Sequence, residues 1–133
     1  MRKNKCEIGT LASIVNNKEE FNNLNIVKVE TFEDLNYLNF LKIKDFFRKT
    51  KSINKKNIYH HIGIYAFKKN TLFRYVKLQR TENEIKRKLE QMRAIDNDIE
   101  IRVALSKSYS LGVDTKEDFL LIKKTMEYKS QKL

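Results

Sequence analysis

The ten residues 58–67 carry the sequence signal that most restricts the fold of this chain. They read IYHHIGIYAF, a run of β-branched and aromatic residues that is typical of a strand. Because successive side chains of a strand point to opposite faces, His61 and Tyr65 share one face, with Gly63 between them, and His60 lies on the other. A glycine inside a strand often marks close approach by a ligand or another backbone. We therefore predict a strand that carries a histidine and a tyrosine on either side of a gap.

The residues before this run predict further strands and little helix. Residues 10–15 (TLASIV) read as a buried strand, residues 16–23 as one helical turn, and residues 25–32 and 37–43 as two more strands. We expect the last two to form an antiparallel hairpin around Glu33 and Asp34. The basic stretch from Lys42 to Lys56 is predicted to be a loop after this hairpin.

The residues after the run alternate between helix and strand. A helix is predicted over 71–78, and Thr81 and Glu84 have the Thr-x-x-Glu spacing of a capping box that starts a second helix. One stripe of that helix holds Ile85, Leu89, Met92 and Ile95. Residues 99–105 alternate as a strand, and Thr115 is the predicted N-cap of a last helix. This alternation indicates an α/β fold with some parallel strand pairing.

The composition bounds the class of protein. Of the 133 residues 41% are apolar, enough for one domain with a modest core. No apolar run approaches the roughly 20 residues of a membrane span, and the first residues lack a signal-peptide pattern. The single cysteine, Cys6, excludes an intramolecular disulfide and a thiolate metal cluster. We expect a cytoplasmic protein with no membrane partner.

The formal net charge of +11 raises the question of nucleic-acid binding. The stretch from Lys42 to Lys56 is densely basic, but aromatic residues do not recur through it as stacking platforms, and no nucleic-acid-binding motif is present. A general lysine and asparagine bias with a solvated loop explains the charge better than nucleic-acid binding. An anionic ligand, such as a sugar acid with a nucleoside triphosphate, also suits a basic protein.

Three groups of polar side chains could bind a ligand. His61 and Tyr65 can each donate and accept hydrogen bonds, although the strand geometry alone favours a histidine and a tyrosine that are satisfied within a core. Glu90 and Gln91 emerge beside a buried leucine and could contact hydroxyls, or remain solvated. Asp114 follows a short strand directly before the last helix, where ligands gather in α/β sheets. Its carboxylate is suited to Mg²⁺ or simply to stabilising the helix start.

The order of three segments resembles one enzyme family. YHHIGIYAF, LEQMRAID and SLGVDTKEDF, preceded by CEIGTLA and NIVKVE, resemble the CMP-KDO synthetases, the 3-deoxy-manno-octulosonate cytidylyltransferases of lipopolysaccharide synthesis. The resemblance spans nearly the whole chain. It implies an α/β fold consisting of an incomplete mixed sheet with flanking helices, the C-terminal part of a Rossmann-like nucleotidyltransferase fold, plus an antiparallel strand pair. It also implies that the chain is an enzyme component that uses the sugar acid KDO.

The resemblance assigns roles to six residues. It implies that His61, Tyr65, Glu90 and Gln91 contact the sugar acid and that Asp114 is one of two carboxylates holding Mg²⁺. Lys42 stands where the family has an arginine. An arginine can bind a carboxylate through two hydrogen bonds, whereas a lysine offers a single point charge. A family glutamate shortly before Glu90 is replaced by Arg87.

The family's CTP-gripping half has no counterpart in this chain. We therefore expect residues 1–133 to be a single partial domain that serves sugar binding and dimerisation and is inactive alone. CTP is expected as a partner only when the missing half is supplied, and the chain itself as a homodimer or one piece of a split enzyme. The strand at 10–15 is expected to leave an unpaired sheet edge. The alternative from another class is a basic, non-catalytic binding module for nucleic acid or another anionic partner.

Overall fold

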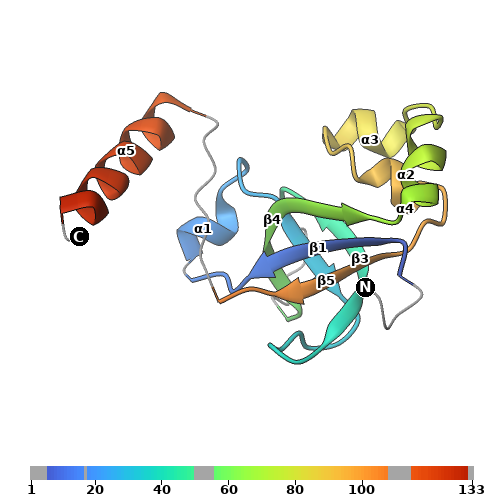
Figure 1. Ribbon diagram of the computed structural model, residues 1–133, viewed down its shortest axis with the longest axis horizontal. Coiled ribbons are helices and arrows are strands. Elements are labelled where there is room, and N and C mark those ends of the chain that lie inside the picture. The colour runs from blue at the N-terminus through green and yellow to red at the C-terminus, as the bar shows by residue number, and fades with distance from the viewer. Residues whose placement is uncertain (1–5, 17, 50–55, 108–114, 132–133) are drawn as a thin grey trace.

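The computed structural model describes residues 6–16, 18–49, 56–107 and 115–131, with side chains up to residue 127. Within these residues there are five strands, which form one sheet, and five helices (Figure 1). The strands are β1 (Ile8–Ser13), β2 (Lys28–Thr31), β3 (Phe40–Phe47), β4 (Ile58–Phe67) and β5 (Ile101–Leu105). The helices are α1 (Lys18–Asn22), α2 (Lys69–Val76), α3 (Glu82–Arg87), α4 (Met92–Asp96) and α5 (Lys116–Gln131).

The sheet closes on itself as a barrel in the order β1-β4-β2-β3-β5. β1 and β5 run parallel, and the other neighbouring strands run antiparallel. The predicted α/β class with a mixed sheet and an antiparallel β2–β3 pair is therefore confirmed. The expected incomplete sheet with an unpaired edge at residues 10–15 is wrong, because the described strands close into a barrel and do not form an open sheet. β1 lies between β4 and β5, and closure of a barrel removes sheet edges altogether.

The barrel and the helices at one of its ends share a hydrophobic core. Its buried members from the strands are Ile8, Ala12, Val29, Ile43, Phe46, Ile101 and Val103. The α3–α4 region adds Leu89, Met92 and Ala94 to the same cluster. In Figure 1, α2, α3 and α4 gather at one end of the barrel, and α1 lies toward the other. The α3–α4 region is thus fixed to the barrel by burial of its apolar side chains.

The strand predicted at 58–67 is β4, and it contains a bulge. Thr10 of β1 pairs with Tyr65, but the next residue, Leu11, pairs with Ile62. Gly63 and Ile64 are therefore extra residues on β4. Because two residues are inserted, His61 and Tyr65 stay on one face, with their ring centroids 5.5 Å apart. A Cβ on Gly63 would meet no atom within 4 Å, so no close protein contact requires this glycine.

The predicted loop from Lys42 to Lys56 is wrong in its first part. β3 runs on to Phe47, with Ile43 and Phe46 buried and Lys42 and Lys44 exposed. Lys42, Ile43 and Lys44 alternate as in a strand with one face in the core. A register shift at Lys44 then places Phe46 on the same side as Ile43. The exposed lysines make this strand resemble a loop in the sequence. Residues 50–55 of the stretch lie outside the described residues.

The predicted stripe of one long helix is also wrong, because the helix breaks after Arg87. Lys88 adopts the left-handed conformation, with φ 55° and ψ 44°, and ends α3. Ile85 is consequently exposed, whereas Leu89 and Met92 are buried. The break places Glu90 and Gln91 in a tight turn before α4 rather than along a helix flank.

Both predicted helix caps are confirmed. The Thr81 hydroxyl accepts from the Glu84 amide, and the Glu84 carboxylate accepts from the Thr81 amide. Thr115 and Asp118 make the same reciprocal pair at the start of α5. α5 stands apart from the barrel in Figure 1. No helix in the described part of the chain is long and apolar enough to cross a membrane.

Candidate functional site

A groove at the helical end of the barrel brings together three of the residues that the sequence singled out. Tyr65 of β4 and Glu90 and Gln91 of the α3–α4 turn line it, and its volume is about 360 Å³. The rest of its wall is mainly apolar and consists of Ile8, Phe67, Leu72, Tyr75, Val76, Ala94 and Ile101. A concave apolar wall with a few convergent polar groups is the usual character of a small-molecule site.

Tyr65 is held by neighbouring rings along β4. Its ring lies 5.5 Å from the His61 ring and 6.3 Å from the Phe67 ring, measured between centroids. Burial, with a smaller effect from Tyr75 and Glu90, raises the pKa of the Tyr65 phenol well above its ordinary value of 10. Tyr65 is therefore a neutral phenol at physiological pH, able to donate one hydrogen bond and accept others.

His61 lies behind Tyr65 and is 8% exposed. One ring nitrogen, Nε2, lies 2.9 Å from the Thr10 hydroxyl, and the Phe46 ring packs edge-on against the imidazole at 4.9 Å. Burial, aided by the neighbouring His60, lowers the pKa of His61 from 6.5 to about 4. The imidazole is thus neutral at physiological pH. His60, on the other face of the strand, pairs with the Glu20 carboxylate at 2.6 Å.

Tyr75 positions the turn that carries Glu90 and Gln91. Its hydroxyl donates to the Glu90 carbonyl at 3.1 Å, and its ring lies 5.6 Å from Phe67. The Arg93 guanidinium sits over the same ring at 5.3 Å. Burial, together with the Glu90 charge, raises the pKa of Tyr75 to about 12. The sequence analysis missed Tyr75, although its position within the predicted 71–78 helix, shortly before the capping box, was a usable signal.

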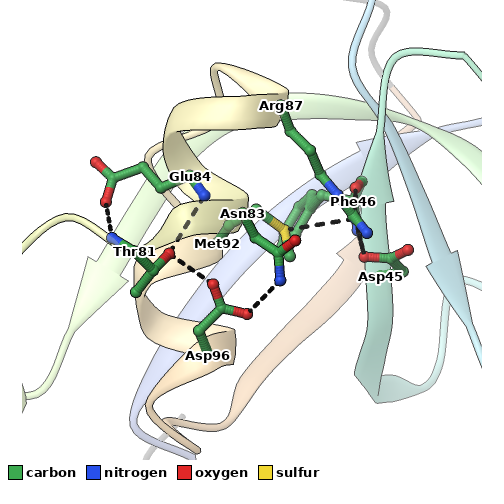
Figure 2. A network of polar contacts seen from close by, with 8 residues as sticks. All are labelled: Asp45, Phe46, Thr81, Asn83, Glu84, Arg87, Met92 and Asp96. Carbon is green, nitrogen blue, oxygen red and sulfur yellow. Dashed lines mark hydrogen bonds and ion pairs between the residues drawn. The ribbon is translucent and has the colours of Figure 1, made fainter.

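A network of polar contacts links the start of α3 to α4, as Figure 2 shows. The Asp96 carboxylate accepts from the Thr81 hydroxyl at 2.6 Å and from the Asn83 amide at 3.1 Å. The Arg93 guanidinium makes a bidentate pair with Glu84, at 2.9 and 2.5 Å. These contacts join the first turn of α3 to α4, on either side of the turn that enters the groove.

Arg87 connects this region to the barrel. In Figure 2 it reaches across to β3, where it donates to the Asp45 carboxylate at 2.6 Å and to the Phe46 carbonyl at 2.9 Å. Phe46 in turn contacts the His61 ring. The arginine that departs from the family pattern therefore has a defined structural role in this chain.

Two of the predicted site residues that the structure describes, His61 and Lys42, are not among the residues that line the groove. Lys42 is exposed on β3 opposite Arg102 of β5. Asp114, the predicted metal ligand, lies outside the described residues. Within the described part of the chain, no three His, Cys, Asp or Glu side chains are grouped so that they could hold a metal ion.

The comparisons with known proteins point to one family. The family model described as Cytidylyltransferase matches residues 1–101. The chain is 34% identical over 126 residues to the 3-deoxy-manno-octulosonate cytidylyltransferase of Bartonella bacilliformis, covering 95% of this chain and 51% of the relative. It is 38% identical over 114 residues to that of Parvibaculum lavamentivorans, covering 85% of this chain and 43% of the relative.

A solved structure agrees with these relatives. The structure of a CMP:2-keto-3-deoxy-manno-octonic acid synthetase complexed with CTP matches with a TM-score of 0.77 at 26% identity. That match covers 100% of this chain and 53% of the other. The chain therefore spans about half the length of the relatives that it matches.

Proposed function

Because the chain belongs to the cytidylyltransferase family, we propose that it is the sugar-acid-binding part of a 3-deoxy-manno-octulosonate cytidylyltransferase. The complete reaction joins CTP and KDO to give CMP-KDO and pyrophosphate. The observation that carries the proposal is the convergence of Tyr65, Glu90 and Gln91 on one groove, with His61 directly behind Tyr65. These residues come from two segments that the resemblance selected independently of the structure.

The groove offers the hydrogen-bonding groups that a polyhydroxy acid needs. The neutral phenol of Tyr65 and the amide of Gln91 can both donate and accept, and the Glu90 carboxylate accepts from hydroxyls. The apolar wall excludes water around the ligand, which strengthens each of these bonds. Lys42 lies on the barrel wall away from this set, so its proposed contact with the substrate requires a ligand that reaches beyond the groove.

We also propose that Asp114 supplies one ligand to Mg²⁺ in the assembled enzyme. When bound, Mg²⁺ neutralises charge on the phosphates of the nucleotide. The chain's own contribution is to bind and orient the sugar acid. In a two-substrate reaction, holding the reactants in the correct geometry can supply a large part of the reduction in activation free energy. We propose that CTP binds only with a further, nucleotide-binding half. The proposed cytoplasmic assembly is a homodimer or a split enzyme.

A titration of the purified chain with KDO, followed by NMR, tests the sugar-binding proposal. We expect shifts at His61, Tyr65, Glu90 and Gln91. Loss of a hydrogen bond to a charged ligand costs about 1.5–3 kcal/mol, so Gln91→Ala should weaken binding about ten-fold or more. Gln79→Ala removes the same side chain from an exposed position and should leave binding unchanged. Shifts that avoid the groove would contradict the proposal.

A turnover assay tests the proposed division of labour. The chain alone, mixed with CTP, KDO and Mg²⁺, should release no pyrophosphate, because the mixture lacks the proposed nucleotide-binding half. KDO-dependent pyrophosphate release from a preparation free of host enzyme would show that the chain is active by itself. Sedimentation of the same preparation tests the homodimer.

A second candidate function rests on the surface charge. Lys44 lies 5.9 Å from the exposed Phe32 ring, and Lys107 lies 5.4 Å from the exposed Tyr37 ring. Aromatic rings beside lysines are a feature of surfaces that stack single-stranded nucleic acid. Binding of an oligonucleotide that weakens steeply with salt, and is lost in Phe32→Ala, would support this binding module over the enzyme component.

A further inference from the structure

The Thr10 hydroxyl makes three polar contacts in the middle of the barrel wall. Its Oγ1 lies 2.9 Å from Nε2 of His61, 2.8 Å from the Ile64 carbonyl and 3.2 Å from the Ile62 carbonyl. Thr10 is buried, and in register it faces Tyr65 across the bulge in β4. The two carbonyls flank Gly63. One hydroxyl therefore contacts both the bulge that precedes Tyr65 and the imidazole behind it.

The number of available protons decides the direction of the His61 contact. A threonine hydroxyl has a single proton, and a carbonyl oxygen can only accept. The proton of Thr10 must therefore point to the Ile62–Ile64 carbonyl pair, because an oxygen 2.8 Å from a carbonyl without a proton between them would be repelled. The remaining contact is then a hydrogen bond that Thr10 accepts. Nε2 of His61 is its donor.

A neutral imidazole carries one N–H, so a proton at Nε2 leaves Nδ1 as an acceptor. His61 is buried against the Phe46 ring, and its pKa is lowered to about 4, so the neutral form predominates at physiological pH. No residue in the described part of the chain hydrogen-bonds to Nδ1. Its lone pair is the polar group that His61 has left to offer a ligand.

We propose that Thr10 is a positioning residue of the sugar-acid site, which holds His61 in the Nε2–H tautomer so that it meets a ligand only as an acceptor, through Nδ1. The proposal rests on the proposed sugar-binding function. It adds a rule of specificity: the ligand group at His61 is a donor, a sugar hydroxyl, because a carboxylate oxygen would face the Nδ1 lone pair with no proton between them. By contacting both carbonyls of the bulge, Thr10 also fixes the backbone that presents Tyr65.

The tautomer can be read without any variant or ligand. In the ¹⁵N spectrum of the imidazole at neutral pH, Nε2 of His61 should resonate as a protonated nitrogen and Nδ1 as an unprotonated one. Thr10→Val keeps the β-branched shape but has no acceptor, so both tautomers should become populated and the two resonances should move toward each other. Thr10→Ser keeps the hydroxyl and should retain the wild-type pattern. A protonated Nδ1 in the wild-type protein overturns the proposal.

The affinity for KDO completes the test. Losing a neutral hydrogen bond or its alignment corresponds to about a three- to ten-fold loss of affinity, which we expect for Thr10→Val and not for Thr10→Ser. If the wild-type chain binds KDO and Thr10→Val binds it equally well, only the positioning role is wrong. If the tautomer is as described but the wild-type chain does not bind KDO, the proposed function is wrong, and the positioning role falls with it.

Discussion

The pair between Arg93 and Glu84 offers a sharp test of how the α3–α4 region is held. Two hydrogen bonds, at 2.9 and 2.5 Å, join the guanidinium and carboxylate, whose side chains are 14% and 8% exposed. Arg93 also covers the Tyr75 ring, which positions the Glu90 turn. Arg93→Met keeps an unbranched, mainly apolar side chain and removes the charge and the hydrogen-bond donors. Among the described residues, the Thr81 amide, at 3.3 Å, is then the only hydrogen-bond donor that remains to the covered Glu84 carboxylate.

The expected cost of Arg93→Met lies between two limits. Removing one partner of a fully buried pair costs about 3–5 kcal/mol, whereas an exposed pair contributes less than about 1 kcal/mol. Because this pair is largely covered and Glu84 keeps one donor, we expect a loss of about 2 kcal/mol. Arg74→Met is the matched control. It breaks the Arg74–Glu7 pair, which has a similar distance of 2.6 Å but side chains 56% and 28% exposed, and it should cost under about 1 kcal/mol.

The same pair predicts a dependence on pH. The hydrogen bonds from Arg93 are the largest cause that holds the pKa of Glu84 below its ordinary value of 4.5. A carboxyl group with a lowered folded-state pKa contributes stability above its unfolded pKa and loses it as the pH falls through the folded value. The difference in unfolding free energy between wild type and Arg93→Met should therefore be full at neutral pH and shrink below pH 4.5. Urea titrations at both pH values measure it. A loss equal to that of Arg74→Met, or one independent of pH, would refute the reasoning.

Three further predictions concern stability. Met92→Ala should cost about 2–5 kcal/mol in a urea titration because Met92 is 2% exposed in the core, whereas Met126→Ala, 67% exposed on α5, should change it by under about 0.5 kcal/mol. Thr81→Ala removes the α3 cap and should lower the free energy of unfolding by about 1 kcal/mol, seen as a lower midpoint at unchanged slope. Lys28 is buried, and this burial lowers its pKa below 10.5. The folded state thus disfavours its charge, so wild-type stability relative to Lys28→Met should rise as the pH rises toward 10.5 in thermal unfolding scans; a flat or falling difference would contradict this.

The parts of the fold that the sequence predicted well depend on interactions between residues close together in the sequence. The strand at Ile58–Phe67 and the caps at Thr81 and Thr115 follow from local alternation and local hydrogen bonding. The shared face of His61 and Tyr65 also held, because the bulge between them adds two residues and preserves the alternation. The meeting of Tyr65 with Glu90 and Gln91 in one groove was predictable only through the family resemblance.

The parts that the sequence did not predict depend on distant contacts or on unusual backbone. Lys88 adopts a left-handed conformation, a position usually occupied by glycine or asparagine at the end of a helix. Because neither residue is present, the sequence predicts one continuous helix across the break. β3 was shortened because its outward lysines resemble a loop, and only the packing of Phe46 in the core reveals the strand. Closure of the barrel rests on pairing between β3 and β5, which no local pattern encodes.

In the parallel pairing of β1 with β5, Ile8 lies opposite Ile101. This large separation in sequence affects the protein during its synthesis on the ribosome. A ribosome adds about 5–20 residues per second, so β1 waits roughly 5–20 s after its own synthesis before its second neighbour is made. During that interval β1 can pair only with β4, and its other side is open to foreign strands. Pairings so distant in sequence also slow folding itself. The vulnerable stage of this protein is therefore its synthesis rather than its finished state, in which the barrel leaves β1 no free side.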